Sequence, residues 1–104
     1  MAKKINVVIK RPGQAAEHEI INETLGNLQK LVDGPIETVR FADGVTMLVN
    51  ELGKIRGLEN NFYLWNDMIV GTAVFVGTEG EEFASCPMSA EKIEEICKMG
   101  VQHG

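Results

Sequence analysis

Short glycine-containing turns between segments rich in β-branched residues constrain the fold of this chain most strongly. The clearest turn is Asp43-Gly44, which joins the segments Ile36–Phe41 and Val45–Val49, and Asp-Gly is a favoured pair for a tight hairpin. Two strands joined by so short a connection pair antiparallel. The sequence therefore predicts a sheet that is antiparallel or mixed.

Hydrophobic patterning predicts the other strands. Besides the hairpin, strands are expected at Lys4–Lys10, Glu17–Ile21, Lys54–Arg56, Met68–Val76 and Glu82–Ser85. The run Met68–Val76 is apolar at most successive positions, which is typical of a strand buried on both faces. The segment between Asn50 and Asn66 is polar and rich in asparagine and glycine, so we expect it to be largely irregular.

Two helices are expected, each with one apolar stripe. The stripes consist of Leu25, Leu28, Leu31 and Val32 in the first helix and Ile93, Ile96 and Cys97 in the second. Asn22 or Thr24 can cap the start of the first helix, and Gly34 ends it by taking the left-handed conformation. The second helix spans residues 90–99 and is capped by Ser89.

The order of these elements favours an α+β domain. We expect an antiparallel or mixed sheet of about five to six strands with two helices packed on one face. The chain has 104 residues, of which 44% are apolar and 24% charged, and this is the size and composition of one globular domain. No repeat or low-complexity segment divides it, so residues 1–104 are expected to form a single domain.

Charge and apolar-run length disfavour several classes of partner. The formal net charge is −5, so the chain has little general attraction for nucleic acid or anionic lipid. A weak nucleic-acid binder stays the last alternative, based on a basic edge of Lys3, Lys4, Lys10, Arg11, Lys54 and Arg56. The longest apolar runs are far shorter than the ~20 residues of a membrane-spanning helix. Without a signal-peptide pattern, the protein is expected to be cytoplasmic with no membrane partner.

Residues suited to catalysis or metal binding are few and scattered. The two cysteines, Cys86 and Cys97, lack a CxxC partner and are expected to be reduced thiols. The two histidines, His18 and His103, are expected to be solvated or incidental, since a zinc site needs three or four ligands at suitable spacing. We therefore predict no catalytic residue, no cofactor and no metal.

Residues 50–67 form the segment with the most unusual content. They include four asparagines and the chain's only tyrosine and tryptophan. Amides beside aromatic side chains suit recognition, because tyrosine and tryptophan give a large contact area with a polar group. The candidate binding residues are Asn50, Glu51, Asn60, Tyr63, Trp65 and Asp67. In the structural alternative, the asparagines form turns and caps while Phe62 and Leu64 anchor the segment to the core.

An ordered set of motifs also resembles a known family. The motifs are Leu28-x-x-Leu31-Val32-x-Gly34-x-Ile36-Glu37, Asp43-Gly44, Val49-Asn50-Glu51-x-Gly53-Lys54-x-x-Gly57-Leu58, Asp67-x-Ile69-x-Gly71-Thr72 and Val76-Gly77. Together they resemble a "domain of unknown function" family of small proteins carried by phages and mobile elements of low-GC Gram-positive gut bacteria. The resemblance covers residues 4–78 and implies a cytoplasmic accessory protein without catalytic residues. The aromatic run 62–65 departs from the family pattern, which has a more polar link there.

Three functions are compatible with these features. The first, which we favour, is a small non-enzymatic interaction protein of a phage or mobile element that docks on an unidentified protein partner, with a regulatory or anti-defence role as one version. The second is a small-molecule-binding protein or small enzyme with a pocket around residues 50–67. The third is the weak nucleic-acid binder. A homodimer stays open, because an exposed edge strand can pair with its twin.

Overall fold

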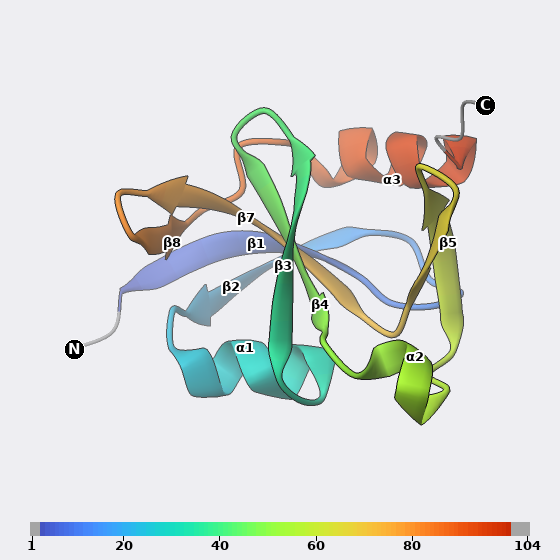
Figure 1. Ribbon diagram of the computed structural model, residues 1–104. Coiled ribbons are helices and arrows are strands. Elements are labelled where there is room, and N and C mark those ends of the chain that lie inside the picture. The colour runs from blue at the N-terminus through green and yellow to red at the C-terminus, as the bar shows by residue number, and fades with distance from the viewer. Residues whose placement is uncertain (1–2, 101–104) are drawn as a thin grey trace.

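The computed structural model describes residues 3–100, and Figure 1 shows their arrangement. The elements in chain order are β1 (Lys4–Lys10), β2 (Glu17–Asn22), α1 (Leu25–Val32), β3 (Ile36–Ala42), β4 (Val45–Asn50), α2 (Gly53–Arg56), β5 (Asn60–Leu64), β6 (Asp67–Val70), β7 (Ala73–Glu79), β8 (Glu82–Ala84) and α3 (Ala90–Met99). The bounds of β1 and α3 coincide with the sequence prediction. His103 lies outside the described residues.

The main sheet follows the order β2-β1-β7-β4-β3. β8 adds a sixth strand by pairing with the C-terminal part of β7, while β5 and β6 form a separate two-stranded sheet. Every strand pair within residues 3–100 is antiparallel. The prediction of an α+β fold with an antiparallel sheet is therefore confirmed.

α1 and α3 cover opposite faces of the main sheet (Figure 1). Leu28 and Val32 of α1 pack in one apolar cluster, and Ile93 and Cys97 of α3 pack in another. The expectation that both helices pack on one face is wrong. The central strands are apolar at successive positions, as in the fully buried residues 7–9 of β1, so each face of the sheet needs its own cover.

The β5–β6 hairpin completes the cover of the face on which α3 lies. Phe62 and Leu64 are buried in the same cluster as α3. The ring of Phe62 stacks near that of Phe75 in β7, with 6.4 Å between the ring centroids. The two side chains therefore anchor the hairpin to the core, as the structural alternative for this segment proposed.

The run Met68–Val76 forms two strands, so the prediction of a single strand is wrong. β6 ends at Val70 and β7 begins at Ala73, with Gly71 between them at φ +75°. A Cβ at Gly71 would lie 2.9 Å from Cδ1 of Leu58. Glycine thus meets both requirements of this turn, the left-handed backbone and the close approach to Leu58.

The expected strand at Lys54–Arg56 is instead part of the one-turn helix α2. Oδ1 of Asn50 accepts the backbone N–H of Leu52 at 2.7 Å, which turns the chain as it leaves β4. Gly57 ends the helix in the left-handed region at φ +70°. A segment of this length carries too little periodicity to separate a strand from a helix, so local hydrogen bonds decide its structure.

The caps at the helix starts are confirmed. Thr24 caps α1 and Ser89 caps α3, and each hydroxyl accepts a backbone N–H at 3.1 Å. At the end of α1, the left-handed residue is Asp33 at φ 64°, one position before the expected Gly34. Gly34 follows at φ +151°, which residues with a side chain rarely adopt, and a Cβ there would lie 2.7 Å from Nδ2 of Asn50.

The helices are short, and α1 and α3 each bury one side. α3 has 10 residues, and no helix within residues 3–100 has the length and apolar content to cross a membrane. In α1, Leu28 and Val32 are buried as expected. Leu25, which the sequence placed on the same stripe, is 63% exposed in the first turn.

Candidate functional site

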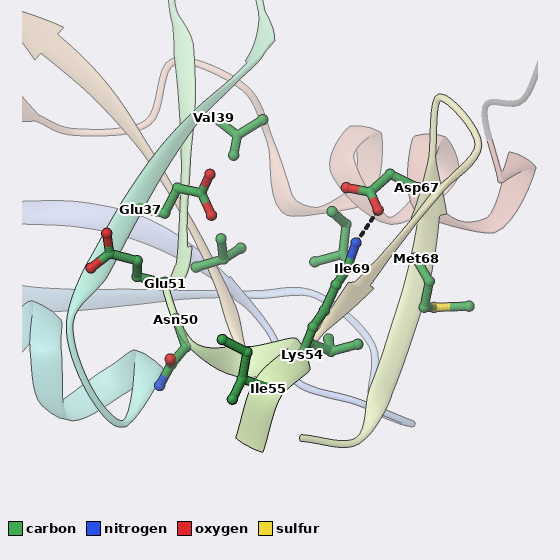
Figure 2. Close-up of a pocket in the computed structure, with 11 residues that line it drawn as sticks. Glu37, Val39, Asn50, Glu51, Lys54, Ile55, Asp67, Met68 and Ile69 are labelled. Carbon is green, nitrogen blue, oxygen red and sulfur yellow. Dashed lines mark hydrogen bonds and ion pairs between the residues drawn. The ribbon is translucent and has the colours of Figure 1, made fainter. Parts of the chain in front are cut away.

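A groove of about 220 Å³ lies between the β3–β4 strands, α2 and β6. Figure 2 shows the side chains that line it. They are Glu37, Val39, Val49, Asn50, Glu51, Lys54, Ile55, Asp67, Met68, Ile69 and Val70. The groove therefore joins residues from the predicted 50–67 segment to residues of β3 and β6 that lie outside it.

The rim of the groove is acidic. Glu37 and Glu51 lie on one side, and Lys54 reaches across from α2 to form an ion pair with Asp67 (Figure 2). Both partners of this pair are more than half exposed, so solvent screens their attraction. Three carboxylates and one ammonium group line the groove, which therefore has an excess of negative charge.

The floor of the groove is apolar. Val49 and Ile69 are buried, and both belong to the cluster beneath α3 and the hairpin. Ile55 of α2 also lines the groove and is 86% exposed. An apolar floor under a charged rim can accept the stem of a long basic side chain while the carboxylates contact its cationic end.

Asn50 lines the groove, but its hydrogen bonds join α1 to α2. The residue is 4% exposed, and Nδ2 donates to the carbonyl oxygens of Val32 at 3.0 Å and Asp33 at 2.8 Å. Oδ1 accepts the N–H of Leu52. Both amide hydrogens and the carbonyl oxygen are therefore used within the fold, and these bonds satisfy carbonyl groups that the end of α1 leaves free.

Arg56 completes this junction between α1 and α2. Nη1 donates to the carbonyl oxygen of Asp33 at 2.6 Å, and Nη2 pairs with Oδ2 of Asp33 at 3.1 Å. A guanidinium group at the C-terminal end of a helix also opposes the negative end of the helix dipole. We call Asn50, Arg56 and Asp33 the α1–α2 junction.

Tyr63 and Trp65 lie in the hairpin but do not line the groove. Tyr63 is 47% exposed and Trp65 is 56% exposed. Trp65 and Asn66 form the two-residue turn of the hairpin, with φ of 50° and 65°, which is the pattern of a type I′ turn. Tyr63 is opposite Met68 of β6, and Met68 lines the groove, so the exposed aromatic surface adjoins its wall.

The other asparagines of the segment differ in their roles. Asn60 is exposed at the start of β5, outside the groove. Nδ2 of Asn61 donates to the carbonyl oxygens of Lys10 and Gly71 at 2.8 Å each, which ties the hairpin to the end of β1 and the start of β7. Of the six predicted binding residues, the groove thus brings together Asn50, Glu51 and Asp67.

Sequence reasoning missed Glu37, Lys54 and Met68 as groove residues. Lys54 lies in the segment 50–67 and Met68 directly follows it. Lys54 is part of a family motif that implies no groove, and Met68 belongs to no motif. Glu37 is in β3, and only the antiparallel register with β4 carries it to the groove beside Val39. The alternation of Glu37, Val39 and Phe41 along one side of a strand is the one sequence signal for this placement.

Comparison with known proteins identifies the family. The family described as "Domain of unknown function (DUF3846)" matches residues 5–99. The chain belongs to this family. No curated protein and no solved structure matches the chain. The match is to a domain of unknown function, as the resemblance implied, and it extends beyond residue 78 to include α3.

In this DUF3846 protein, Cys97 is buried and Cys86 is partly buried. Burial raises the pKa of the Cys97 thiol to about 12, and burial also raises the pKa of Cys86. A raised pKa leaves little of the reactive thiolate near neutral pH. His18 has a structural contact, because Nε2 accepts the N–H of Ala90 at the start of α3 at 3.1 Å. Within residues 3–100, no three His, Cys, Asp or Glu side chains cluster as metal ligands do.

The basic side chains considered for nucleic-acid binding are mostly engaged within the DUF3846 fold. Lys10 is buried, and Lys3, Arg11, Lys54 and Arg56 each form an ion pair with a carboxylate. A nucleic-acid surface needs cations that are free to face phosphates. The geometry of these side chains therefore gives little support to that alternative.

Proposed function

We propose that this protein is a non-enzymatic interaction protein that binds a positively charged segment of a partner protein in the acidic groove. The observation that carries the proposal is the excess of carboxylates over an apolar floor. Opposite charge at an interface favours the right partner and speeds its association. The apolar floor adds contact area for the methylene groups of a lysine or arginine side chain.

The size of the groove favours a side chain over a small molecule. Its volume of about 220 Å³ is below the roughly 300–1,000 Å³ of typical small-molecule sites. General acid–base catalysis also requires groups that converge on a substrate, whereas Asn60, Tyr63 and Trp65 lie outside the groove. The enzyme alternative therefore has weaker support than the interaction function.

The biological setting we propose follows from the sequence resemblance. A small accessory protein of a phage or mobile element acts in the cytoplasm by docking on a protein of the host or of the element. A regulatory or anti-defence role is one form of such docking. The paired cations of the chain and its net charge of −5 make a basic protein surface a better partner than nucleic acid.

The test is a titration of the ¹⁵N-labelled protein with a cationic probe, followed by amide chemical shifts. The probe is the acetylated and amidated peptide Thr-Lys-Thr-Val-Thr-Lys-Thr, and the control peptide has glutamate in place of both lysines. We expect the lysine peptide to shift amides around residues 37–39, 49–55 and 67–70, and the glutamate peptide to leave them in place.

Charge variants show whether the groove itself is responsible. The double variant Glu37→Gln/Glu51→Gln is expected to weaken binding of the lysine peptide by about fivefold or more, because it removes two rim charges. The matched control is Glu81→Gln/Glu91→Gln, which removes two exposed carboxylates away from the groove and is expected to change binding less than about twofold. Equal weakening by both variants, or no binding of the lysine peptide, would contradict the proposal.

A further inference from the structure

We propose that the partner segment binds as an added β-strand along the free edge of β3, with alternate side chains entering the acidic groove. The inference rests on the proposed function and specifies its mode: an extended peptide that places a basic side chain beside Glu37 and an apolar one beside Val39. Strand addition of this kind supplies backbone hydrogen bonds for affinity and side-chain pockets for specificity.

The edge of β3 is free within the described residues. β3 is the last strand of the sheet order and pairs only with β4. In an antiparallel pair, alternate residues of an edge strand direct their N–H and C=O groups away from the partner strand. Figure 1 shows β3 at the front of the molecule, with neither α3 nor the hairpin lying over its outer side. The edge therefore offers an unused row of hydrogen-bonding groups to an incoming chain.

The length of the free edge suits a short segment. The register with β4 is regular from Ile36 to Arg40 and shifts between Arg40 and Ala42. A bulge of this kind disturbs the ladder and limits pairing at that end. Five residues, Ile36–Arg40, thus form the regular part of the edge on which a partner strand can pair.

Two hollows follow β3 and share Val39. The acidic groove includes Glu37 and Val39, and a second, more open hollow of about 360 Å³ includes Thr38, Val39 and Arg40. The two hollows lie on opposite faces of the sheet, because Thr38 and Arg40 alternate with Glu37 and Val39 along the strand. A strand added at the edge directs its side chains alternately to both faces, so both hollows adjoin the strand on which it would pair.

The alternation of side chains in β3 sets the chemistry of the partner strand. Glu37 and Val39 share one face and line the acidic groove, whereas Thr38 and Arg40 point to the other face. Cross-strand neighbours on one face lie within contact distance of each other. We therefore expect lysine or arginine opposite Glu37, a β-branched residue opposite Val39, and small polar residues between them.

A second copy of the chain is a poorer occupant of this edge than a basic segment. Two copies would bring together two chains with a net charge of −5 each, and each would place Glu37 and Glu51 near the shared edge. Like charges at an interface oppose association. Charge complementarity thus favours a basic partner over self-pairing.

The test changes the peptide and leaves the protein intact, so protein folding does not affect the result. Two forms of the lysine peptide carry N-methyl groups on alternate amides, one on the odd and one on the even positions. A strand that pairs through one edge uses only one set of amides. We expect one methylated peptide to bind like the parent and the other to bind about tenfold more weakly or worse, because its N–H donors to β3 are lost.

The possible outcomes separate the two proposals. If both methylated peptides bind like the parent, or both lose binding equally, strand addition is overturned while binding in the groove stands. If the unmodified lysine peptide does not shift the groove amides, the proposed function itself fails. If amides 36–40 shift with protein concentration in the absence of peptide, the edge pairs with a second copy, and the proposal of a basic partner strand is overturned.

Discussion

Asn50 and Glu51 are neighbours in the chain, but they belong to two regions with opposite properties. Asn50 is buried in the α1–α2 junction, where its amide makes three hydrogen bonds to the backbone. Glu51 is exposed at the rim of the acidic groove, and Lys54, the cation among the lining residues, is paired with Asp67. The polar groups of the junction stabilise the fold, whereas the exposed carboxylates of Glu37 and Glu51 at the groove can contact a partner.

This contrast explains why a polar, aromatic-rich segment is ambiguous when only the sequence is known. The same residue type, asparagine, can cap a helix or bind a ligand, and only the hydrogen-bond partners of its amide distinguish the two roles. In residues 50–67, Asn50, Asn61 and Asn66 serve the fold through a helix end, a strand connection and a hairpin turn. The charged residues Glu51, Lys54 and Asp67 are the polar residues of the segment that remain at the groove surface.

The largest expected effect is that of Asn50→Ala at the junction. The substitution leaves the carbonyl oxygen of Val32 and the N–H of Leu52 without a side-chain partner, while the carbonyl oxygen of Asp33 keeps only its bond from Arg56. Unsatisfied buried groups cost roughly 1–3 kcal/mol each, and partial access to water reduces the sum, so we expect a loss of about 3 kcal/mol in the free energy of unfolding. Urea denaturation measures this value.

The matched control for that variant is Asn60→Ala. Asn60 is also an asparagine of the 50–67 segment, but it is exposed at the start of β5. Surface substitutions of this kind change stability by less than about 0.5 kcal/mol. Equal effects of the two variants would show that the junction does not depend on the Asn50 amide.

The next largest effect is a loss of stability at alkaline pH, caused by Cys97 of α3. Cys97 packs in the same apolar cluster as the groove residues Val49 and Ile69. Burial raises the pKa of the folded Cys97 thiol from 9.0 to about 12. Above pH 9 the thiol ionises in the unfolded chain but stays protonated in the folded one, so the unfolded state binds fewer protons and stability falls as pH rises. The melting temperature should therefore drop between pH 8 and pH 10.5.

The variant Cys97→Val isolates this contribution. Valine is an apolar residue of similar size that does not titrate, so the decline attributable to residue 97 disappears while other groups titrate as before. The comparison uses the difference between the two pH values within each protein, which removes any constant packing cost. If the melting temperature falls equally in the two proteins between these pH values, burial does not raise the pKa of the Cys97 thiol as described.

A smaller effect is expected for Arg56→Gln in the junction. Arg56 is partly exposed and bonds both the carbonyl oxygen and the carboxylate of Asp33. Its loss should cost about 1 kcal/mol, between the value of a surface pair and that of a charge-assisted hydrogen bond. The control Arg40→Gln removes an exposed pair with Asp43 and should cost less than about 0.5 kcal/mol. If Arg56→Gln lowers the free energy of unfolding less than the control does, Arg56 does not stabilise the junction.

The sequence predicts what local interactions decide. The Asp43-Gly44 hairpin and the caps Thr24 and Ser89 depend on residues close in the chain, and all three are found. The placement of α1 and α3 on opposite faces depends instead on how β1, β4 and β7 assemble. The groove depends on the same assembly, since Glu37 of β3 and Asp67 of β6 line one groove only because the hairpin packs against the sheet.

The smallest stability change is expected for Glu37→Gln/Glu51→Gln, the variant with the largest expected effect on binding. Both carboxylates are exposed, so their replacement should change the free energy of unfolding by less than about 0.5 kcal/mol. Urea denaturation of this variant beside Asn50→Ala tests the contrast between the groove and the junction directly. A loss above about 1 kcal/mol would mean that the rim carboxylates also serve the fold. A loss of peptide binding at unchanged stability would separate the two regions, because residues that hold a fold together cannot be neutral to its unfolding.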